Sequence, residues 1–386
     1  MTHSTRRRAT ISAIGITAAL ALSACSSTSE EPTDSGDGGD GGGALTPVSL
    51  QLQWLPQGQF AGYFAAQEQG FFEEEGLEVE IIPSGGDIVP QDALANGDVD
   101  YAIAWVPKVL GSIEAGADIT NIAQIFQRSG TLQVAWADSG IESIKDFEGK
   151  TIGSWGFGNE WEIFAAMAEN GVDASTVEII TQDFNMNAFL SGDIDAAQAM
   201  TYNEYAQLFE TPNPETGELY TPDDFNVIDY NETGGSMLQD AIWADAERIA
   251  DDEEYQQTTV AFLKAVIKGW VYARDNPEEA SEITLNAGSG WGPSHELWMV
   301  NETNKLIWPS PNGIGIIDEE EWNSTVALSL ATVNETGAQI ITEEPPATAW
   351  SNEWIQQALD QLTEEGVDVT GEGFEPIEVE LNEGGN

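Results

Sequence analysis

The sequence predicts an α/β fold of two lobes, each a mostly parallel sheet flanked by helices, with a ligand cleft between them. The first observation is a strand, a helix and a second strand in succession between Val48 and Ile82. The second is a new series of strands and helices that follows Gly140. The chain of 386 residues is long enough to build two such lobes.

A change in the spacing of apolar residues defines the first strand–helix–strand unit. An apolar run of strand length covers 48–54 and breaks at Pro56. From Phe60 the apolar residues fall at helical spacing as far as Gly70, and alternation resumes over 77–82.

Aromatic and polar side chains follow the strands of this first lobe. Trp54, Gln57 and Gln59 come between the first strand and its helix, and a later buried strand ends in Trp105. Open α/β sheets bind small molecules at the carboxyl ends of their strands, so these residues indicate a binding site. The turn over 84–87 either cradles an oxygen-rich ligand or is simply a tight turn.

A glycine loop in the second lobe predicts another part of the site. Residues 156–160, Gly-Phe-Gly-Asn-Glu, follow a strand that ends in Trp155 and open a helix. The glycines let the backbone approach a ligand, and the helix N-terminus offers N–H donors. The alternative is that Trp155 and Trp161 only pack the core.

A third strand end carries Tyr202, Asn203 and Glu204. A carboxylate can accept hydrogen bonds from the N–H donors of a flat heterocycle, so Glu204 is the preferred specificity residue, although it also suits a helix start. Asn185 is a further candidate, or only a helix cap. The predicted ligand-binding residues are Gln53, Trp54, Gln59, Phe60, Trp105, Trp155, Gly156, Phe157, Asn159, Glu160, Asn185, Tyr202, Asn203 and Glu204.

The N-terminus predicts export and lipid anchoring. Three arginines precede an apolar run over 11–22 that is too short to span a bilayer, and Leu-Ser-Ala-Cys follows. Residues 1–24 are therefore expected to be a lipoprotein signal peptide and Cys25 a lipid-modified anchor, with an ordinary signal peptide as the alternative. Residues 25–44 read as a disordered acidic Gly/Ser tether. Cys25 is the single cysteine, which excludes an internal disulfide and a Cys-ligated metal site.

The domain limits follow from these elements. We expect the first part of lobe 1 over 45–137, lobe 2 over 138–230, and the return to lobe 1 with C-terminal helices over 231–386. From Leu238 onward the pattern predicts a largely helical chain.

The chain is strongly acidic, with 67 Asp and Glu against 12 Lys and Arg and a net charge of −55. Such a chain is repelled by nucleic acid and by anionic lipid headgroups. We expect the acidity to reflect a saline exterior, where salt screens the self-repulsion. The melting temperature should then rise between low salt and molar salt, and a flat response would contradict this expectation.

The stretch QWLPQGQFAGYFAAQEQGFFEEEGLEVEI over 53–81 resembles the opening motif of extracytoplasmic solute-binding proteins of the thiamine-pyrimidine-precursor type, often described as sulfonate, nitrate or taurine binders. The resemblance extends in order along most of the chain. It implies the type II periplasmic-binding-protein fold, in which the lobes close on a ligand and a membrane permease of an ABC importer recognises the closed form.

The resemblance also implies a ligand class and a rival. Aromatic plates, amides and carboxylates suit a planar heterocycle such as a thiamine-pyrimidine precursor or a flavin, whereas an organic anion such as a sulfonate needs more cations. The rival is the related thiamine pyrimidine synthase, whose pattern needs a cofactor-bearing lysine, a histidine and a cysteine cluster. Here the strand end reads 104–108, Ala-Trp-Val-Pro-Lys, with Lys108 at the histidine position and Phe60 replacing another histidine. We therefore predict a binding protein without cofactor, metal or catalytic residues.

Overall fold

The computed structural model describes residues 44–386. The predicted signal peptide, Cys25 and nearly all of the tether lie outside the described residues. No helix within the described part is long and apolar enough to cross a membrane.

Two five-stranded mixed sheets form the framework, which confirms the predicted α/β class. The first has the order β2-β1-β3-β10-β4 and the second the order β7-β6-β8-β5-β9. In each sheet the fourth strand of that order runs antiparallel to both of its neighbours. The strands of the first sheet are β1 (Thr46–Gln51), β2 (Leu77–Ile82), β3 (Tyr101–Trp105), β4 (Ile119–Gln124) and β10 (Asp240–Asp245); those of the second are β5 (Thr131–Trp136), β6 (Thr151–Ser154), β7 (Glu178–Thr181), β8 (Ala196–Met200) and β9 (Phe225–Asp229).

Helices cover both faces of the first sheet, and we call this group of elements the first lobe. Alternate residues of β3 point to opposite faces, as a strand requires: Tyr101 and Ile103 pack with α1 and α9, and Ala102 and Ala104 with α3 and α4. The helices of this lobe are α1 (Ala61–Glu68), α2 (Phe71–Glu74), α3 (Pro90–Ala95), α4 (Val106–Glu114), α8 (Ala246–Asp251), α9 (Glu253–Asp275), α10 (Pro277–Asn286), α11 (Pro293–Ile307), α12 (Glu319–Ala331) and α13 (Glu353–Glu364).

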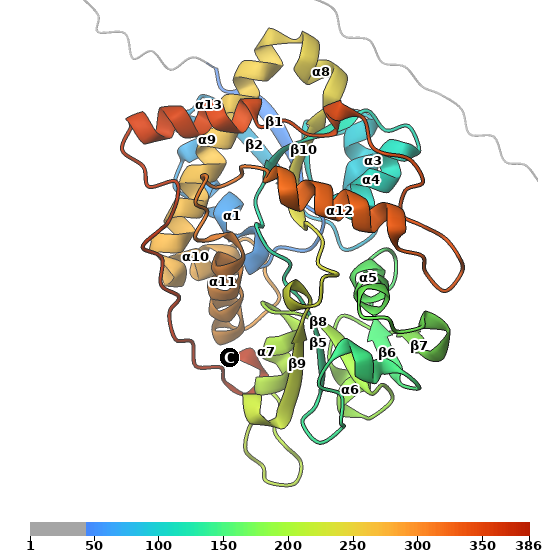
Figure 1. The fold of residues 1–386 in the computed structure, drawn as a ribbon. Helices are drawn as coiled ribbons and strands as arrows, with labels where there is room; N and C mark the ends of the chain where they lie inside the picture. Colours follow the sequence, from blue (N-terminus) through green and yellow to red (C-terminus); the bar gives the residue numbers. More distant parts are fainter. Residues whose placement is uncertain (1–43) are drawn as a thin grey trace, which may run out of the picture. The chain divides into compact units, whose positions relative to one another are not determined.

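The second sheet and its helices form the second lobe, drawn mainly in green in Figure 1. The helix α5 (Trp161–Glu169) packs on one face through Ile163 and Phe164. The other face is covered by α6 (Asn187–Leu190) and α7 (Glu204–Phe209), through Phe189 and Leu208. Each lobe thus has a core on both faces of its sheet.

Two segments of the chain, the crossings, connect the two sheets, and the strand pairing shows where they lie. Because β5 pairs with β8 and β9 in the second sheet, the first crossing lies between residues 124 and 131, upstream of the predicted limit at residue 138. The second crossing joins β9 to β10. Gln239 connects the two crossings: its amide accepts from Gly130 N at 2.8 Å and donates to Thr131 Oγ1 at 2.7 Å.

The chain from Leu238 onward is largely helical, as expected, and the strand β10 is the exception. It is inserted antiparallel between β3 and β4, and its first five residues are buried. A short apolar run that is buried on both faces shows no alternation, so its period cannot distinguish strand from helix.

A close approach of two helices organises the core of the first lobe. A Cβ atom on Gly269 of α9 would lie 2.0 Å from the carbonyl oxygen of Gly62 on α1, and one on Gly62 would lie 2.2 Å from the indole of Trp270. Both glycines therefore allow backbones to pack where no side chain fits.

We predict that Gly269→Ala destabilises the protein by about 2 kcal/mol, because overpacking outweighs the gain of about 1 kcal/mol in helix propensity. Urea unfolding measures the change. The matched control is Gly290→Ala, where an added Cβ would meet nothing within 4 Å. A Gly269→Ala protein as stable as the control would contradict the close-packing argument.

Candidate functional site

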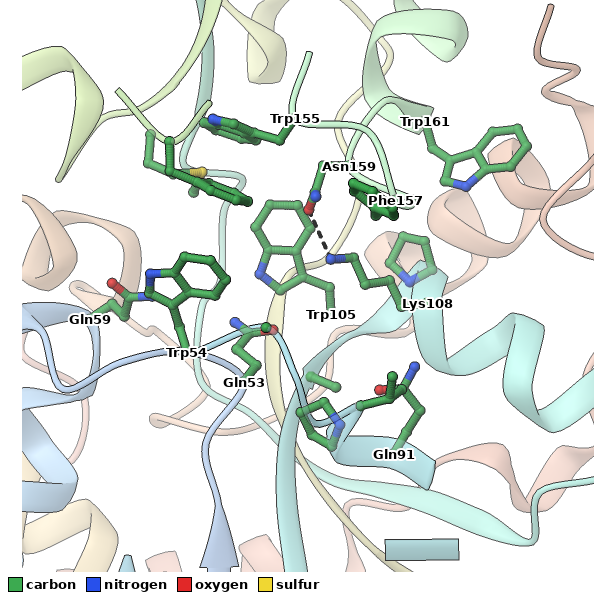
Figure 2. A pocket seen from close by; sticks show the side chains of 18 of the residues that line it. Gln53, Trp54, Gln59, Gln91, Trp105, Lys108, Trp155, Phe157, Asn159 and Trp161 are labelled. Atoms are coloured by element: carbon green, nitrogen blue, oxygen red, sulfur yellow. Dashed lines mark hydrogen bonds between the residues drawn. The ribbon is translucent and has the colours of Figure 1, made fainter. Parts of the chain in front are cut away.

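A cavity of about 720 Å³ lies between the two lobes. It is surrounded by the carboxyl ends of β1 and β3 in the first lobe and of β6 and β8 in the second. Figure 2 shows Trp54, Trp105, Trp155 and Phe157 around this space. The residues that line the cavity include Gln53, Trp54, Gln57, Gln59, Gln91, Trp105 and Lys108 of the first lobe, and Trp155, Phe157, Asn159, Trp161, Phe184, Met200, Tyr202, Asn203 and Glu204 of the second.

Aromatic rings from both lobes meet along one wall. The ring of Phe184 lies 4.6 Å from that of Trp54, across the cleft, and 6.1 Å from that of Trp155, to which it is nearly parallel with an interplanar angle of 15°. These spacings are within the range of favourable aromatic contacts. The wall therefore spans the cleft and offers ring faces to a planar ligand.

The glycine loop has three consecutive residues in the left-handed region. Their φ values are 69° at Gly156, 54° at Phe157 and 88° at Gly158, and Phe157 is 90 % exposed. Asn159 holds the loop closed by donating from Nδ2 to Gly156 O at 2.7 Å. A left-handed phenylalanine whose ring is exposed beside a cavity is strained, and such strain is concentrated at ligand sites.

Lys108, on α4, crosses the cleft toward this loop. Its Nζ donates to Asn159 Oδ1 at 2.8 Å and lies 5.1 Å from the centre of the Trp105 ring. Burial lowers the pKa of Lys108 to about 8, against the opposing charges of Glu160 and Asp240. Lys108 is the one cationic side chain among the residues that line the cavity.

A buried carboxyl group, that of Asp240, lies behind Gln53 and Trp105, which line the cavity. Asp240 Oδ1 accepts from Gln53 Nε2 and from Trp105 Nε1, both at 2.6 Å. Burial raises the pKa of Asp240 to about 7, while these two hydrogen bonds and Lys108 lower it. Asp240 itself does not line the cavity; it acts on two residues that do.

Glu204 lines the cavity but is 2 % exposed and bonded within the protein. Its Oε2 accepts from Met200 N at 3.0 Å, and its Oε1 accepts from Asn203 Nδ2 at 3.2 Å. Burial raises the pKa of Glu204 to about 7. Asn203 in turn bonds through Oδ1 to His295 Nε2 at 3.0 Å, which ties this corner of the site to α11 of the first lobe.

The structure brings ten of the fourteen predicted residues to the cavity: Gln53, Trp54, Gln59, Trp105, Trp155, Phe157, Asn159, Tyr202, Asn203 and Glu204. Their strands all end at the edge of a sheet that faces the other lobe. Trp155 therefore lines the cavity although it is also largely buried, and Trp161 lines it as well.

Four predicted residues do not line the cavity. Phe60 is fully buried and packs toward Tyr63, because the turn of η1 (Gly58–Phe60) directs it into the core. Gly156 supports the loop through backbone contacts, and Glu160 accepts from Gly158 N at 2.8 Å. Asn185 accepts from Asn187 N at 2.9 Å in the turn before α6, whose N-cap residue is Met186, so it is not the cap itself.

Residues of the site that were absent from the predicted set include Phe184 and Lys108, which line the cavity, and Asp240, which lies behind it. Phe184 follows β7, at the same sheet edge as the other aromatic residues of the cavity. Its position after a strand was the sequence feature that could have identified it. Lys108 sits one helical turn beyond a strand end, so only the tertiary fold directs it inward. Asp240 belongs to the strand that periodicity did not distinguish from a helix.

Comparison with known proteins gives relatives at low identity. The chain is 24% identical to a formylaminopyrimidine-binding protein of Halalkalibacterium halodurans over 290 residues, covering 74% of this chain and 84% of that protein. It is 26% identical to the riboflavin-binding protein RibY of Chloroflexus aurantiacus, covering 62% and 66%. It is 24% identical to a 4-amino-5-hydroxymethyl-2-methylpyrimidine phosphate synthase of Legionella pneumophila, covering 62% and 73%.

Solved structures share the fold. A periplasmic sulfonate-binding protein from Methylobacillus flagellatus superposes with a TM-score of 0.58 at 17% identity, covering 88% of this chain and 99% of that one. A family model described as NMT1/THI5 like matches residues 57–280, more than half of the chain. The protein therefore belongs to the NMT1/THI5-like family.

Proposed function

We propose that this protein is the extracytoplasmic solute-binding component of an ABC importer and that it captures a small planar heterocycle by closure of its lobes. The observation that carries the proposal is the aromatic wall of Trp54, Phe184 and Trp155, which joins the two lobes across the cavity. A flat ring inserted there would contact both lobes at once, so binding would favour the closed form.

The polar groups of the cavity favour a neutral or amine-bearing heterocycle. Two amides, Gln57 and Gln59, have buried Oε1 atoms without a hydrogen-bond partner within residues 44–386. Ligand N–H groups would satisfy such acceptors. The relatives that bind formylaminopyrimidine and riboflavin support this class, and the thiamine-pyrimidine precursors and flavins are the leading candidates.

An organic anion such as a sulfonate is the second candidate for the ligand. Lys108 is the lining residue that would pair with it, and the structural neighbour that binds sulfonate supports it at the level of fold. A buried anion usually requires more than one cation or a nest of N–H donors. The acidic chain would also repel it, so we rank this candidate second.

An enzyme is the rival to a binding protein, since the synthase of Legionella is also a relative. The resemblance requires a cofactor-bearing lysine, a histidine and several cysteines. The sequence has the single cysteine Cys25, and the cavity lining includes Lys108 but no histidine. These departures favour binding without catalysis. We further propose that Cys25 carries a lipid anchor that keeps the protein near its permease.

Native mass spectrometry of the purified protein tests the proposal, with aminopyrimidines, thiamine, riboflavin, taurine and nitrate as probes. We expect a one-to-one adduct with a heterocycle. Glu204→Gln should weaken an amine-bearing probe about tenfold, since one hydrogen bond to a charged group contributes about 1.5–3 kcal/mol.

The matched control for Glu204→Gln is Glu296→Gln, because Glu296 is equally buried but does not line the cavity. Adducts with taurine or nitrate alone would show that the ligand is an anion and not a heterocycle. Conversion of an aminopyrimidine probe, rather than its binding, would instead support the enzyme.

Because Phe157 is both exposed at the cavity and strained, we predict that replacing it lowers the affinity for the ligand without lowering the stability of the protein. Phe157→Gly should weaken heterocycle binding up to about tenfold through loss of an aromatic contact. Unfolding free energy should stay unchanged or rise by up to about 1 kcal/mol, because glycine adopts the left-handed conformation without strain.

Phe157→Ala is the matched comparison, since it removes the ring and keeps the strained backbone. It should lose the same affinity and gain no stability. Calorimetry gives the affinity and urea unfolding gives the stability. Full affinity in both variants would mean that Phe157 does not contact the ligand.

A further inference from the structure

Asp240 occupies an unusual position for a charged residue. It is the first residue of β10, directly after the second crossing between the lobes, and it is 2 % exposed. Its carboxyl group lies behind Gln53, which follows β1, and Trp105, the last residue of β3; both line the cavity. The group is therefore placed to act on the ligand through these two side chains.

The two hydrogen bonds to Asp240 determine which way the Gln53 amide faces. The indole N–H of Trp105 can only donate, so Asp240 Oδ1 is an acceptor. Gln53 meets the same oxygen at 2.6 Å and must turn its nitrogen toward it. Its Oε1 then points elsewhere, and no donor within residues 44–386 bonds to it.

The side-chain amides of Gln57 and Gln59, which also line the cavity, are not restrained in this way. No hydrogen bond holds the side chain of Gln57 or Gln59 within the described part of the chain. An amide without a partner can turn over and adapt to either a donor or an acceptor on the ligand. Gln53 is different because turning it over would place its oxygen against Asp240 Oδ1.

We propose that Asp240 is a positioning residue that determines ligand specificity: it fixes Gln53 as an acceptor, so the ligand edge that meets Gln53 must carry an N–H or O–H donor. This inference rests on the proposed function, because it states which hydrogen-bonding groups that same site requires of its ligand. It selects heterocycles with an amino group or a ring N–H over analogues in which that donor is replaced by an ether or a methylated nitrogen.

The arrangement does not depend on the protonation state of Asp240. The groups that act on its charge are Lys108 and the hydroxyls of Tyr63 and Tyr202. Because Oδ1 accepts two hydrogen bonds, any proton on the carboxyl group belongs on Oδ2, which has no partner in the described structure. Gln53 thus donates to Oδ1 in both states.

The first test compares two probes, an aminopyrimidine and the methoxypyrimidine that differs only at that substituent. The wild-type protein should prefer the amine at least about tenfold, as expected for a site built around a donor. Asp240→Asn keeps the Oδ1 acceptor and should keep this preference. Asp240→Ala should reduce it to less than about threefold by letting Gln53 turn over.

A double-mutant cycle separates positioning from a general loss of structure. If Asp240 acts through Gln53, then Asp240→Ala should not change the preference further in a Gln53→Leu protein. Asp240→Ser is the second variant should Asp240→Ala fail to fold. An undiminished amine preference in the folded Asp240→Ala or Asp240→Ser protein would overturn the inference and leave the proposed function standing.

The second test needs no ligand, so it separates this inference from the proposed function. The indole N–H of Trp105 and the side-chain amide of Gln53 are followed by NMR and assigned with Trp105→Phe and Gln53→Leu. Both signals should exchange slowly with solvent in wild type and Asp240→Asn, and faster in Asp240→Ala. Unchanged exchange in Asp240→Ala would overturn the inference, whereas failure of every heterocycle to bind would overturn the proposed function.

Discussion

The two connections between the sheets meet at the start of β10, and this contact fixes how the chain passes from one lobe to the other. The carbonyl oxygen of Asp240 accepts from Ile125 N and Phe126 N, each at 3.1 Å, and these residues begin the first crossing. This contact joins the two connections between the sheets. The carboxyl group of the same residue accepts from Gln53 and Trp105, so the junction of the two connections and the cavity share one residue.

The few lysines of this acidic chain lie in different surroundings. The two lysines of α9, Lys264 and Lys268, lie 3.0 Å and 2.9 Å from Glu75 oxygens. Lys108 faces the cavity instead, where its charge is opposed by Glu160 and the buried Asp240. A chain with a net charge of −55 therefore keeps one lysine at this cavity.

Stability and binding impose different demands on the glycine loop. Burying Phe157 would remove an exposed ring, but the loop holds it toward the cavity in a left-handed conformation. The cost is tolerated because Asn159 and Glu160 close the loop around it. Such a residue is visible in the sequence as a phenylalanine between two glycines, but its exposure is not.

Local patterns determined much of this protein. Strand, turn and helix signals around residues 46–82 and 151–171 predicted the elements that carry Trp54 and Trp155, because period and turn chemistry depend on neighbours in the chain. Strand ends predicted ten cavity residues, since the carboxyl ends of parallel strands share one edge. The family resemblance came from the same stretch.

Only the tertiary structure decided the remainder. It inserted β10 between β3 and β4, a pairing between residues more than a hundred positions apart that leaves no local signature. It buried Phe60 and directed Phe184 and Lys108 into the cleft, because the direction of a side chain depends on what packs around it. It also placed Asp240 against Gln53, which converts an amide that could donate or accept into one that accepts.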